Sequence, residues 1–142
     1  MKSVDLYQIH FPYTLISKTS LMEALARAVK SGKAKAVGVS NYSAEQMKRA
    51  YAILDKHGVK LASNQVQYSL ISRKPETNGI LETCRKLKVS LIAYSPLGQG
   101  ILTGKYIGQN ARSVSGARRF LSQFREKSLE KAAPIVDRKS VV

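Results

Sequence analysis

Cysteine is almost absent from this sequence, and tryptophan is missing entirely. The 142 residues include one cysteine, Cys84, and no tryptophan. A lone cysteine cannot close an internal disulfide and has no partner for a metal cluster, so a reducing intracellular compartment is favoured. We therefore expect the protein in the cytoplasm or in a plastid, and we expect no metal site.

Long apolar runs and acidic residues are also scarce. No segment approaches the ~18 apolar residues of a membrane span, and the N-terminus lacks a signal-peptide pattern. The 24 Lys and Arg against 9 Asp and Glu give a net charge of +15. That charge would suit a phosphate-bearing ligand, a nucleic acid or an acidic membrane surface. However, most basic residues fall on polar faces of predicted helices, without aromatic interleaving, so we expect neither a nucleic-acid nor a membrane partner.

Short β-branched segments alternate with segments of helical periodicity along most of the chain. Such βα units predict an α/β fold with a parallel sheet, either an open doubly wound sheet or a closed (β/α) barrel. Ser20 is expected to cap the first helix, and Ser43 with Gln46 has the spacing of a capping box for the second. A last amphipathic helix is predicted from Phe120 onward. The predicted strands are Val4–His10, Ala36–Ser40, Leu61–Ser69 and Val89–Ser95, with a further helix at Thr77–Leu87.

Polar side chains lie toward the carboxyl end of each predicted strand or just beyond it. They are His10, Ser40 with Asn41, Asn64 with Gln65, and Tyr94 with Ser95. Each of them alone has an ordinary structural explanation, as a turn former, a paired buried amide or a core aromatic. The carboxyl ends of parallel strands share one edge, where such folds bind their ligands. Their coincidence at successive strand ends therefore favours a ligand site.

Four motifs in this order, VDLYQIHFP, VGVSNYS, SNQVQYS and AYSPLGQGILTGKY, resemble the aldo-keto reductase family. The resemblance runs from about Val4 to Tyr106 and implies a partial (β/α)₈ TIM barrel of about four βα units, resembling the fourth to seventh strands. The first three strands and the eighth would be lacking. We expect residues 1–106 to form this partial barrel. Residues 107–142 would be a basic loop and an amphipathic helix.

The resemblance implies NADPH-dependent reduction of an aldehyde or ketone by hydride transfer, with a small carbonyl compound as substrate. His10 matches the family's active-site histidine, which can donate a hydrogen bond to the substrate oxygen. Asn41 and Gln65, with Ser40 beside them, match the residues that bind the nicotinamide carboxamide, a group with both a donor and an acceptor. Tyr94 matches the aromatic residue that stacks on the nicotinamide ring.

The turn after Tyr94 matches the family's phosphate-binding loop. Backbone N–H groups of a glycine-containing turn can cradle pyrophosphate oxygens. Arg118 and Arg119 lie in the basic region where relatives often place a basic residue near the cofactor phosphates. The matching loop residues are Ser95, Pro96, Leu97, Gly98, Gln99 and Gly100.

The family's catalytic tyrosine, lysine and aspartate come from elements that precede the histidine strand, and none is recognisable here. A closed barrel takes roughly 200–250 residues, so this chain amounts to about half of one. We therefore expect a truncated chain that is inactive or impaired as an oxidoreductase. Its open barrel edges predict marginal stability or self-association. The alternative is a non-catalytic module that binds NADP in a regulatory role.

Overall fold

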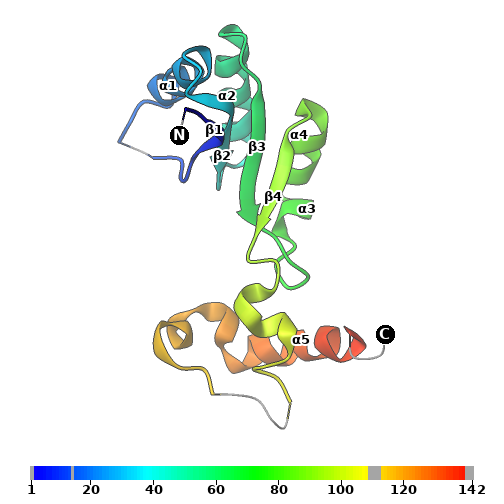
Figure 1. The fold of residues 1–142 in the computed structure, drawn as a ribbon. Helices are drawn as coiled ribbons and strands as arrows, with labels where there is room; N and C mark the ends of the chain where they lie inside the picture. Colours follow the sequence, from blue (N-terminus) through cyan, green and yellow to red (C-terminus); the bar gives the residue numbers. More distant parts are fainter. Residues whose placement is uncertain (1, 14, 109–112, 140–142) are drawn as a thin grey trace. The chain divides into compact units, whose positions relative to one another are not determined.

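The computed structural model describes residues 2–13, 15–108 and 113–139 (Figure 1). Its contacts divide the chain into two compact units. The first comprises Met1–Gln67 and Lys74–Tyr94, and the second comprises Tyr68–Arg73 and Ser95–Val142. The predicted boundary near Tyr106 stays a prediction. Of the predicted loop 109–119, residues 109–112 lie outside the described residues.

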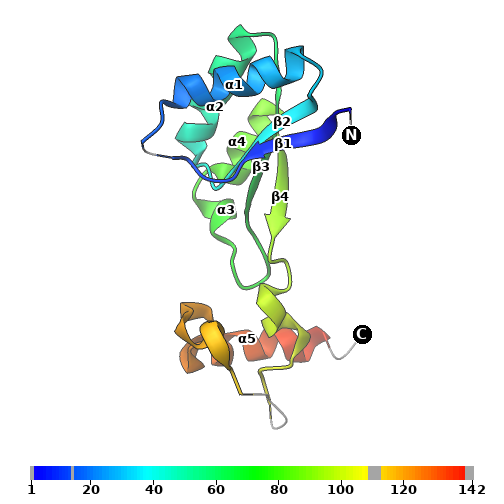
Figure 2. The ribbon, with the colours of Figure 1, turned by 60° about the vertical axis from the view of Figure 1, so that its left-hand side comes forward.

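The first unit is a parallel sheet of four strands in the order β1-β2-β3-β4, which confirms the predicted α/β class. Helices α1 (Lys18–Lys30), α2 (Ala44–Lys56) and α4 (Ile80–Leu87) pack in sequence along one face of the sheet (Figure 2), and the short α3 spans Lys74–Thr77. The strands are β1 (Val4–Ile9), β2 (Ala34–Ser40), β3 (Leu61–Gln67) and β4 (Ser90–Tyr94).

Alternation along the strands separates an apolar face from a polar one. Val37 and Val39 are fully buried in the core that the helices cover. Gly38 and Ser40 therefore face the opposite side, because successive residues of a strand point to opposite faces. The core under the helices also contains Met22, Leu25, Ala26, Met47, Ala50, Leu54, Leu61 and Cys84. Burial raises the pKa of the Cys84 thiol, so this residue is protonated and shielded.

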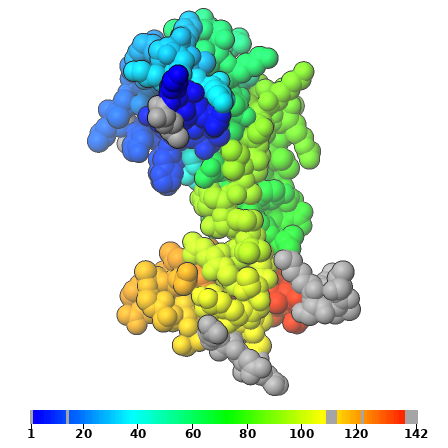
Figure 3. Space-filling view, viewed as in Figure 1, coloured from blue at the N-terminus to red at the C-terminus, as the bar shows by residue number. Residues whose placement is uncertain are grey.

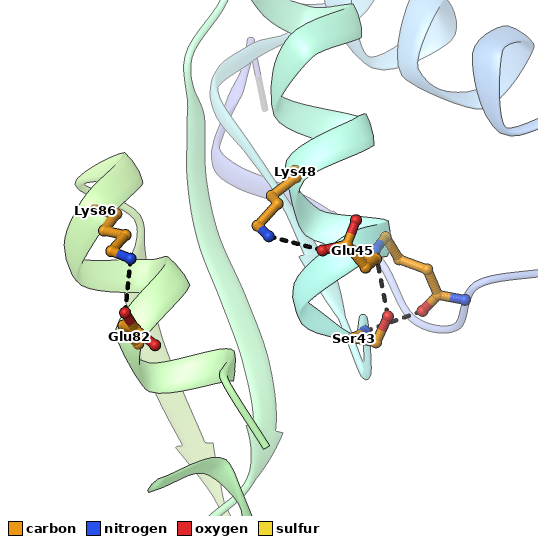
Figure 4. A network of polar contacts seen from close by, with 6 residues as sticks. Ser43, Glu45, Lys48, Glu82 and Lys86 are labelled. Atoms are coloured by element: carbon orange, nitrogen blue, oxygen red, sulfur yellow. Dashed lines mark hydrogen bonds and ion pairs between the residues drawn. The ribbon is translucent and has the colours of Figure 1, made fainter. Parts of the chain in front are cut away.

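Helix α2 begins as the sequence predicts. The Ser43 hydroxyl accepts a hydrogen bond from the Gln46 N–H at 3.3 Å, and the Gln46 side-chain oxygen accepts one from the Ser43 N–H at 3.0 Å (Figure 4). This confirms the capping box. On the same helix Glu45 pairs with Lys48, and the hydrogen bond from Lys48 lowers the pKa of the Glu45 carboxyl.

Several element boundaries differ from prediction: β2 begins at Ala34, two residues early, α4 begins at Ile80, three residues late, and β1 and β4 differ by one residue at their ends. Helix α1 begins at Lys18 with Ser17 as its N-cap, because the Ser17 hydroxyl accepts from the N–H of Ser20. Strand β3 ends at Gln67, before a turn in which Ser69 and Ser72 form an isolated bridge. The last helix, α5, spans Glu126–Lys139, and short 3₁₀ turns at Gly116–Phe120 and Ser122–Phe124 precede it.

The second unit has its own small core. Ile101 lies on a 3₁₀ segment, Gly98–Thr103, and is buried with Tyr106, Phe124 and Ala132. The rings of Tyr106 and Phe124 meet edge to face, with their centroids 5.2 Å apart. A cavity of about 400 Å³ lies in this unit, lined among others by Tyr106, Phe124 and Leu129. None of the predicted site residues lines it.

Candidate cofactor site

Five of the predicted site residues meet at the carboxyl edge of the sheet. Strand pairing places Ser40 opposite Gln65, and Ile9, which precedes His10, opposite Val39. Because all four strands run parallel, their carboxyl ends lie at the same edge. The residues gathered there are His10, Ser40, Asn41, Gln65 and Tyr94.

Asn41 connects the four strand ends at this edge. Its backbone N–H donates to the Gln65 carbonyl at 2.8 Å. Its side-chain Nδ2 donates to the His10 carbonyl and to the Ser40 hydroxyl, both at 3.1 Å. Its Oδ1 accepts from the Tyr94 hydroxyl at 3.0 Å. Asn41 thus bonds to residues at the ends of β1, β2, β3 and β4.

The backbone of Asn41 is left-handed, with φ 61°. Asparagine is one of the few residues besides glycine that adopt this conformation routinely. The left-handed turn occurs at the point where the chain leaves β2. It allows the N–H and the side chain of the same residue to reach different neighbouring strands.

Ser40 and Gln65 complete the polar edge. The buried Ser40 hydroxyl donates to the Gln65 carbonyl at 2.9 Å, so β2 and β3 are joined by a side chain as well as by the ladder. Within the described residues, the half-buried Gln65 carboxamide makes no hydrogen bond. One donor and acceptor pair is therefore free at this edge.

His10 lies just beyond β1 and is exposed. Its ring lies 4.6 Å from that of Phe11, between centroids, and its backbone carbonyl accepts from Asn41. The imidazole nitrogens make no hydrogen bond with any described residue. The ring is therefore available to a ligand at the same edge.

Asn64 proves to have a structural role. It is fully buried, its Nδ2 donates to the Tyr42 carbonyl at 3.0 Å, and its Oδ1 accepts from the Tyr42 N–H at 3.4 Å. The Tyr42 hydroxyl is buried without a partner among the described residues, and burial raises its pKa. This pair anchors the turn after Asn41 on the side of the helices.

Sequence reasoning missed a polar pair on the open face of the sheet. The Gln8 amide nitrogen donates to the Ser63 hydroxyl at 2.9 Å, across the intervening strand at Gly38. Gln8 lies two residues before His10, and Ser63 two before Gln65. The strand period of two could have revealed that these residues share a face with the site.

The predicted phosphate-loop residues lie in the second unit. Ser95, Gly98, Gln99 and Gly100 all have positive φ, between 53° and 99°. The N–H groups of Gly98 and Gly100 donate to the carbonyls of Ser95 and Leu97, so the turn itself uses these two donors. A Cβ at Gly98 would lie 2.6 Å from the side chain of Ile71, so glycine is required on packing grounds too. Pro96 and Leu97 are exposed.

Arg118 and Arg119 are exposed in the 3₁₀ turn Gly116–Phe120. The Arg119 guanidinium lies 4.9 Å from the centroid of the Phe120 ring, a cation–π distance. Both side chains belong to the second unit, as the phosphate-loop residues do. Their role toward cofactor phosphates stays a prediction.

A parallel sheet covered by helices on one face, with a polar carboxyl edge, is the arrangement of a (β/α) barrel enzyme. The aldo/keto reductase family model matches residues 1–137, and this chain belongs to that family of oxidoreductases. The family generally depends on a nicotinamide cofactor and acts on small carbonyl compounds. The predicted family and partial barrel fold are thereby confirmed.

Relatives and solved structures agree with this assignment. The chain is 37% identical over 139 residues to probable pyridoxal reductase 2 of Schizosaccharomyces pombe, covering 95% of this chain and 40% of the relative. It is 38% identical over 117 residues to the chloroplastic pyridoxal reductase of Arabidopsis thaliana, covering 80% and 32%. The glycerol dehydrogenase structure from Gluconobacter oxydans superposes with a TM-score of 0.81 at 29% identity, covering 97% and 40%. The chain thus spans two fifths or less of these relatives.

Two further structural findings concern membrane-spanning helices and metal-binding side chains. No helix in the described parts of the chain is long and apolar enough to cross a membrane. Across residues 2–13, 15–108 and 113–139, no group of three or more His, Cys, Asp or Glu side chains is arranged to hold a metal ion.

Proposed function

We propose that the carboxyl edge of this sheet binds the nicotinamide end of NADPH, as part of an aldo-keto reductase that reduces aldehydes or ketones. When bound, the dihydronicotinamide supplies the hydride. The observation that carries the proposal is the Asn41 network beside an unpaired Gln65 carboxamide.

The available donors and acceptors fit a carboxamide. Both N–H bonds of the Asn41 amide are used within the protein, but its Oδ1 accepts a single hydrogen bond, from Tyr94. An amide oxygen has a second lone pair, so Asn41 presents an acceptor to a ligand NH₂ group. The Gln65 side chain still has donors to offer a ligand carbonyl. Asn41 and Gln65 together therefore complement both ends of a carboxamide.

His10 and Tyr94 have separate tasks in the proposed reaction. An exposed imidazole at the strand end can donate a hydrogen bond to a substrate carbonyl oxygen and orient it, which lowers the barrier through alignment. The Tyr94 hydroxyl is fixed by Asn41, which holds the phenol ring at the end of β4. A fixed ring offers a flat apolar surface for the nicotinamide.

A second candidate function is a non-catalytic NADP-binding or regulatory module. The observation that favours it is that, within residues 1–142, a motif match to the family's catalytic group is recognised at His10 alone. We propose that hydride-transfer turnover by this chain alone is absent or impaired.

Titration of the chain with NADPH tests the cofactor site. We expect Gln65→Leu to weaken NADPH binding about tenfold, because a lost hydrogen bond in a shielded site costs about 1.4 kcal/mol. The probe without a nicotinamide, 2′-phospho-ADP-ribose, should bind the wild type and Gln65→Leu equally. Equal loss for both ligands would place the effect outside the nicotinamide site, and unchanged NADPH affinity would contradict the proposal.

Turnover of 4-nitrobenzaldehyde at family-like rates would exclude the non-catalytic module.

We also propose that the chain self-associates through β1 and β4. Within the described sheet each of these strands pairs with one neighbour, so each leaves a row of backbone groups open. Leu6, Tyr7 and Phe11 are exposed along and just after β1, which lies at the surface in Figure 3. Sedimentation velocity over a concentration series should show a rising mass, and Leu6→Lys should shift the equilibrium toward monomer. A concentration-independent monomer would contradict this.

A further inference from the structure

Lysines cluster at the edge of the sheet where the strands begin, opposite the candidate cofactor site. Lys33 directly precedes β2, Lys60 directly precedes β3, and Lys88 lies two residues before β4. The helices return to the same edge, because each βα unit brings the chain back to the start of the next strand. We call this exposed cluster the basic rim; it comprises Lys2, Arg27, Lys30, Lys33, Lys35, Lys56, Lys60, Arg85, Lys86 and Lys88.

Few carboxylates offset these cations. Asp5 pairs with Lys35 at 2.6 Å, and Glu82 pairs with Lys86 at 2.6 Å (Figure 4). The other members of the basic rim form no ion pair with any described residue. Asp55, beside Lys56 in the last turn of α2, is a further carboxylate at this edge, so the positive charge there is offset only in part, and it faces away from the uncharged carboxyl edge. The structure thus gathers at one edge basic residues that the sequence distributes over several predicted helices.

Helix dipoles explain only part of the basic rim. Basic residues in the last turn of a helix interact favourably with its negative end, and this accounts for Arg27, Lys30, Lys56, Arg85 and Lys86. Lys33, Lys60 and Lys88 lie beyond the helix ends, at the starts of adjacent strands. The pairing register sets Leu61 opposite Val37 and Ser90 opposite Ser63, so these lysines follow one staggered edge of the sheet, where their like charges repel one another to an extent that salt screens. An anionic surface would relieve this repulsion.

The chemistry of the basic rim suits lipid headgroups better than nucleic acid. Eight of its ten members are lysines, which act as flexible point charges, whereas arginine forks are preferred for nucleic-acid phosphates. Helix C-termini, not N-termini, face this edge. The free N–H groups of a helix N-terminus are therefore not available there to bind the phosphate groups of a nucleic-acid backbone. The exposed aromatic residues of the first unit, Tyr7, Phe11 and Tyr13, are not members of the basic rim, so this unit offers no base-stacking platform there.

We propose that the basic rim docks this chain on an anionic lipid surface. Because the basic rim and the carboxyl edge lie at opposite ends of the strands, docking leaves His10, Asn41 and Gln65 facing the aqueous phase. The basic rim carries no apolar anchor, so the contact is electrostatic, reversible by salt and dependent on anionic lipid. The expectation, drawn from sequence, of no membrane partner stays a prediction, and vesicle binding decides between it and this proposal.

Vesicle co-sedimentation of the whole chain tests the proposal. We expect binding to phosphatidylserine-containing vesicles at low salt, release at high salt, and no binding to pure phosphatidylcholine. The triple variant Lys33→Glu/Lys60→Glu/Lys88→Glu should lose at least about tenfold in vesicle affinity. A matched control reverses the same charge elsewhere, in Lys18→Glu/Arg49→Glu/Lys74→Glu, and should lose far less.

Each alternative outcome overturns the proposal. Equal losses in the two triple variants would mean that net charge, not the basic rim, drives binding. Failure of the wild type to bind phosphatidylserine vesicles would exclude the lipid surface. Tighter binding to duplex DNA than to vesicles, with the same dependence on the basic rim, would make nucleic acid the partner. Circular dichroism verifies that both triple variants fold. NADPH affinity should be unchanged in the basic-rim variant, which would show that its loss of vesicle binding does not come from damage to the cofactor site.

Discussion

Asn41→Ala is expected to lose about 3 kcal/mol of unfolding free energy and at least about tenfold in NADPH affinity. The substitution removes three side-chain hydrogen bonds, each of which contributes roughly 0.5–1.5 kcal/mol. It also places alanine in a left-handed conformation, which costs about 1 kcal/mol more. Urea unfolding and NADPH titration measure the two losses.

Two further variants separate the causes. Asn41→Gly also removes the side chain but tolerates φ 61°, so it should be more stable than Asn41→Ala by about 1 kcal/mol while binding NADPH equally poorly. Tyr94→Phe removes one hydrogen bond of the network and keeps the ring, so its effect on stability should be smaller. If Asn41→Ala bound NADPH as the wild type does, the network would not belong to the cofactor site.

The predictable parts of this fold are those that local patterns specify. The strands follow from β-branched segments bounded by turn residues, and the capping box of α2 follows from the spacing of Ser43 and Gln46. The expected cap of α1, Ser20, was wrong because Ser17, three positions earlier, is an equally good N-cap residue. The structure uses Ser17 as the acceptor and Ser20 as the donor.

The meeting of the candidate site residues at one edge was predictable, but their hydrogen-bond network was not. Parallel strands bring their carboxyl ends together, so the meeting of His10, Asn41, Gln65 and Tyr94 follows from topology. The left-handed turn at Asn41 and its bonds to neighbouring strands depend on register and side-chain orientation, which no local pattern encodes. The Gln8 to Ser63 bond escaped prediction for the same reason, since it joins residues 55 positions apart.

The charge distribution shows the same limit. Lysines before strands and lysines in last helix turns look unrelated along the sequence. A parallel topology places both at one edge, because every strand start and every helix end meets there. Only the fold therefore distinguishes a local cluster of charge from a dispersed one.

Gly38→Ala is expected to destabilise the sheet by about 1–3 kcal/mol, the usual range for overpacking in a well-packed structure. A Cβ at this position would lie 2.2 Å from the Ser63 hydroxyl and 3.1 Å from the Gln8 side chain. Gln8 holds that hydroxyl at 2.9 Å, so Ser63 cannot move away without losing its hydrogen bond. Urea unfolding measures the loss.

The double variant Gly38→Ala/Ser63→Ala provides the control for this steric explanation. It removes the oxygen that the new methyl group would meet, so it should recover part of the stability lost in Gly38→Ala, whereas Ser63→Ala alone should be mildly destabilising. Additive losses would show that the two positions do not interact and that the strands relax around the methyl group. Recovery would establish that Gly38 is glycine because Gln8 and Ser63 meet across its strand. Since those residues lie two positions before His10 and Gln65, the packing of this layer would then set the spacing of the strands that carry the candidate site.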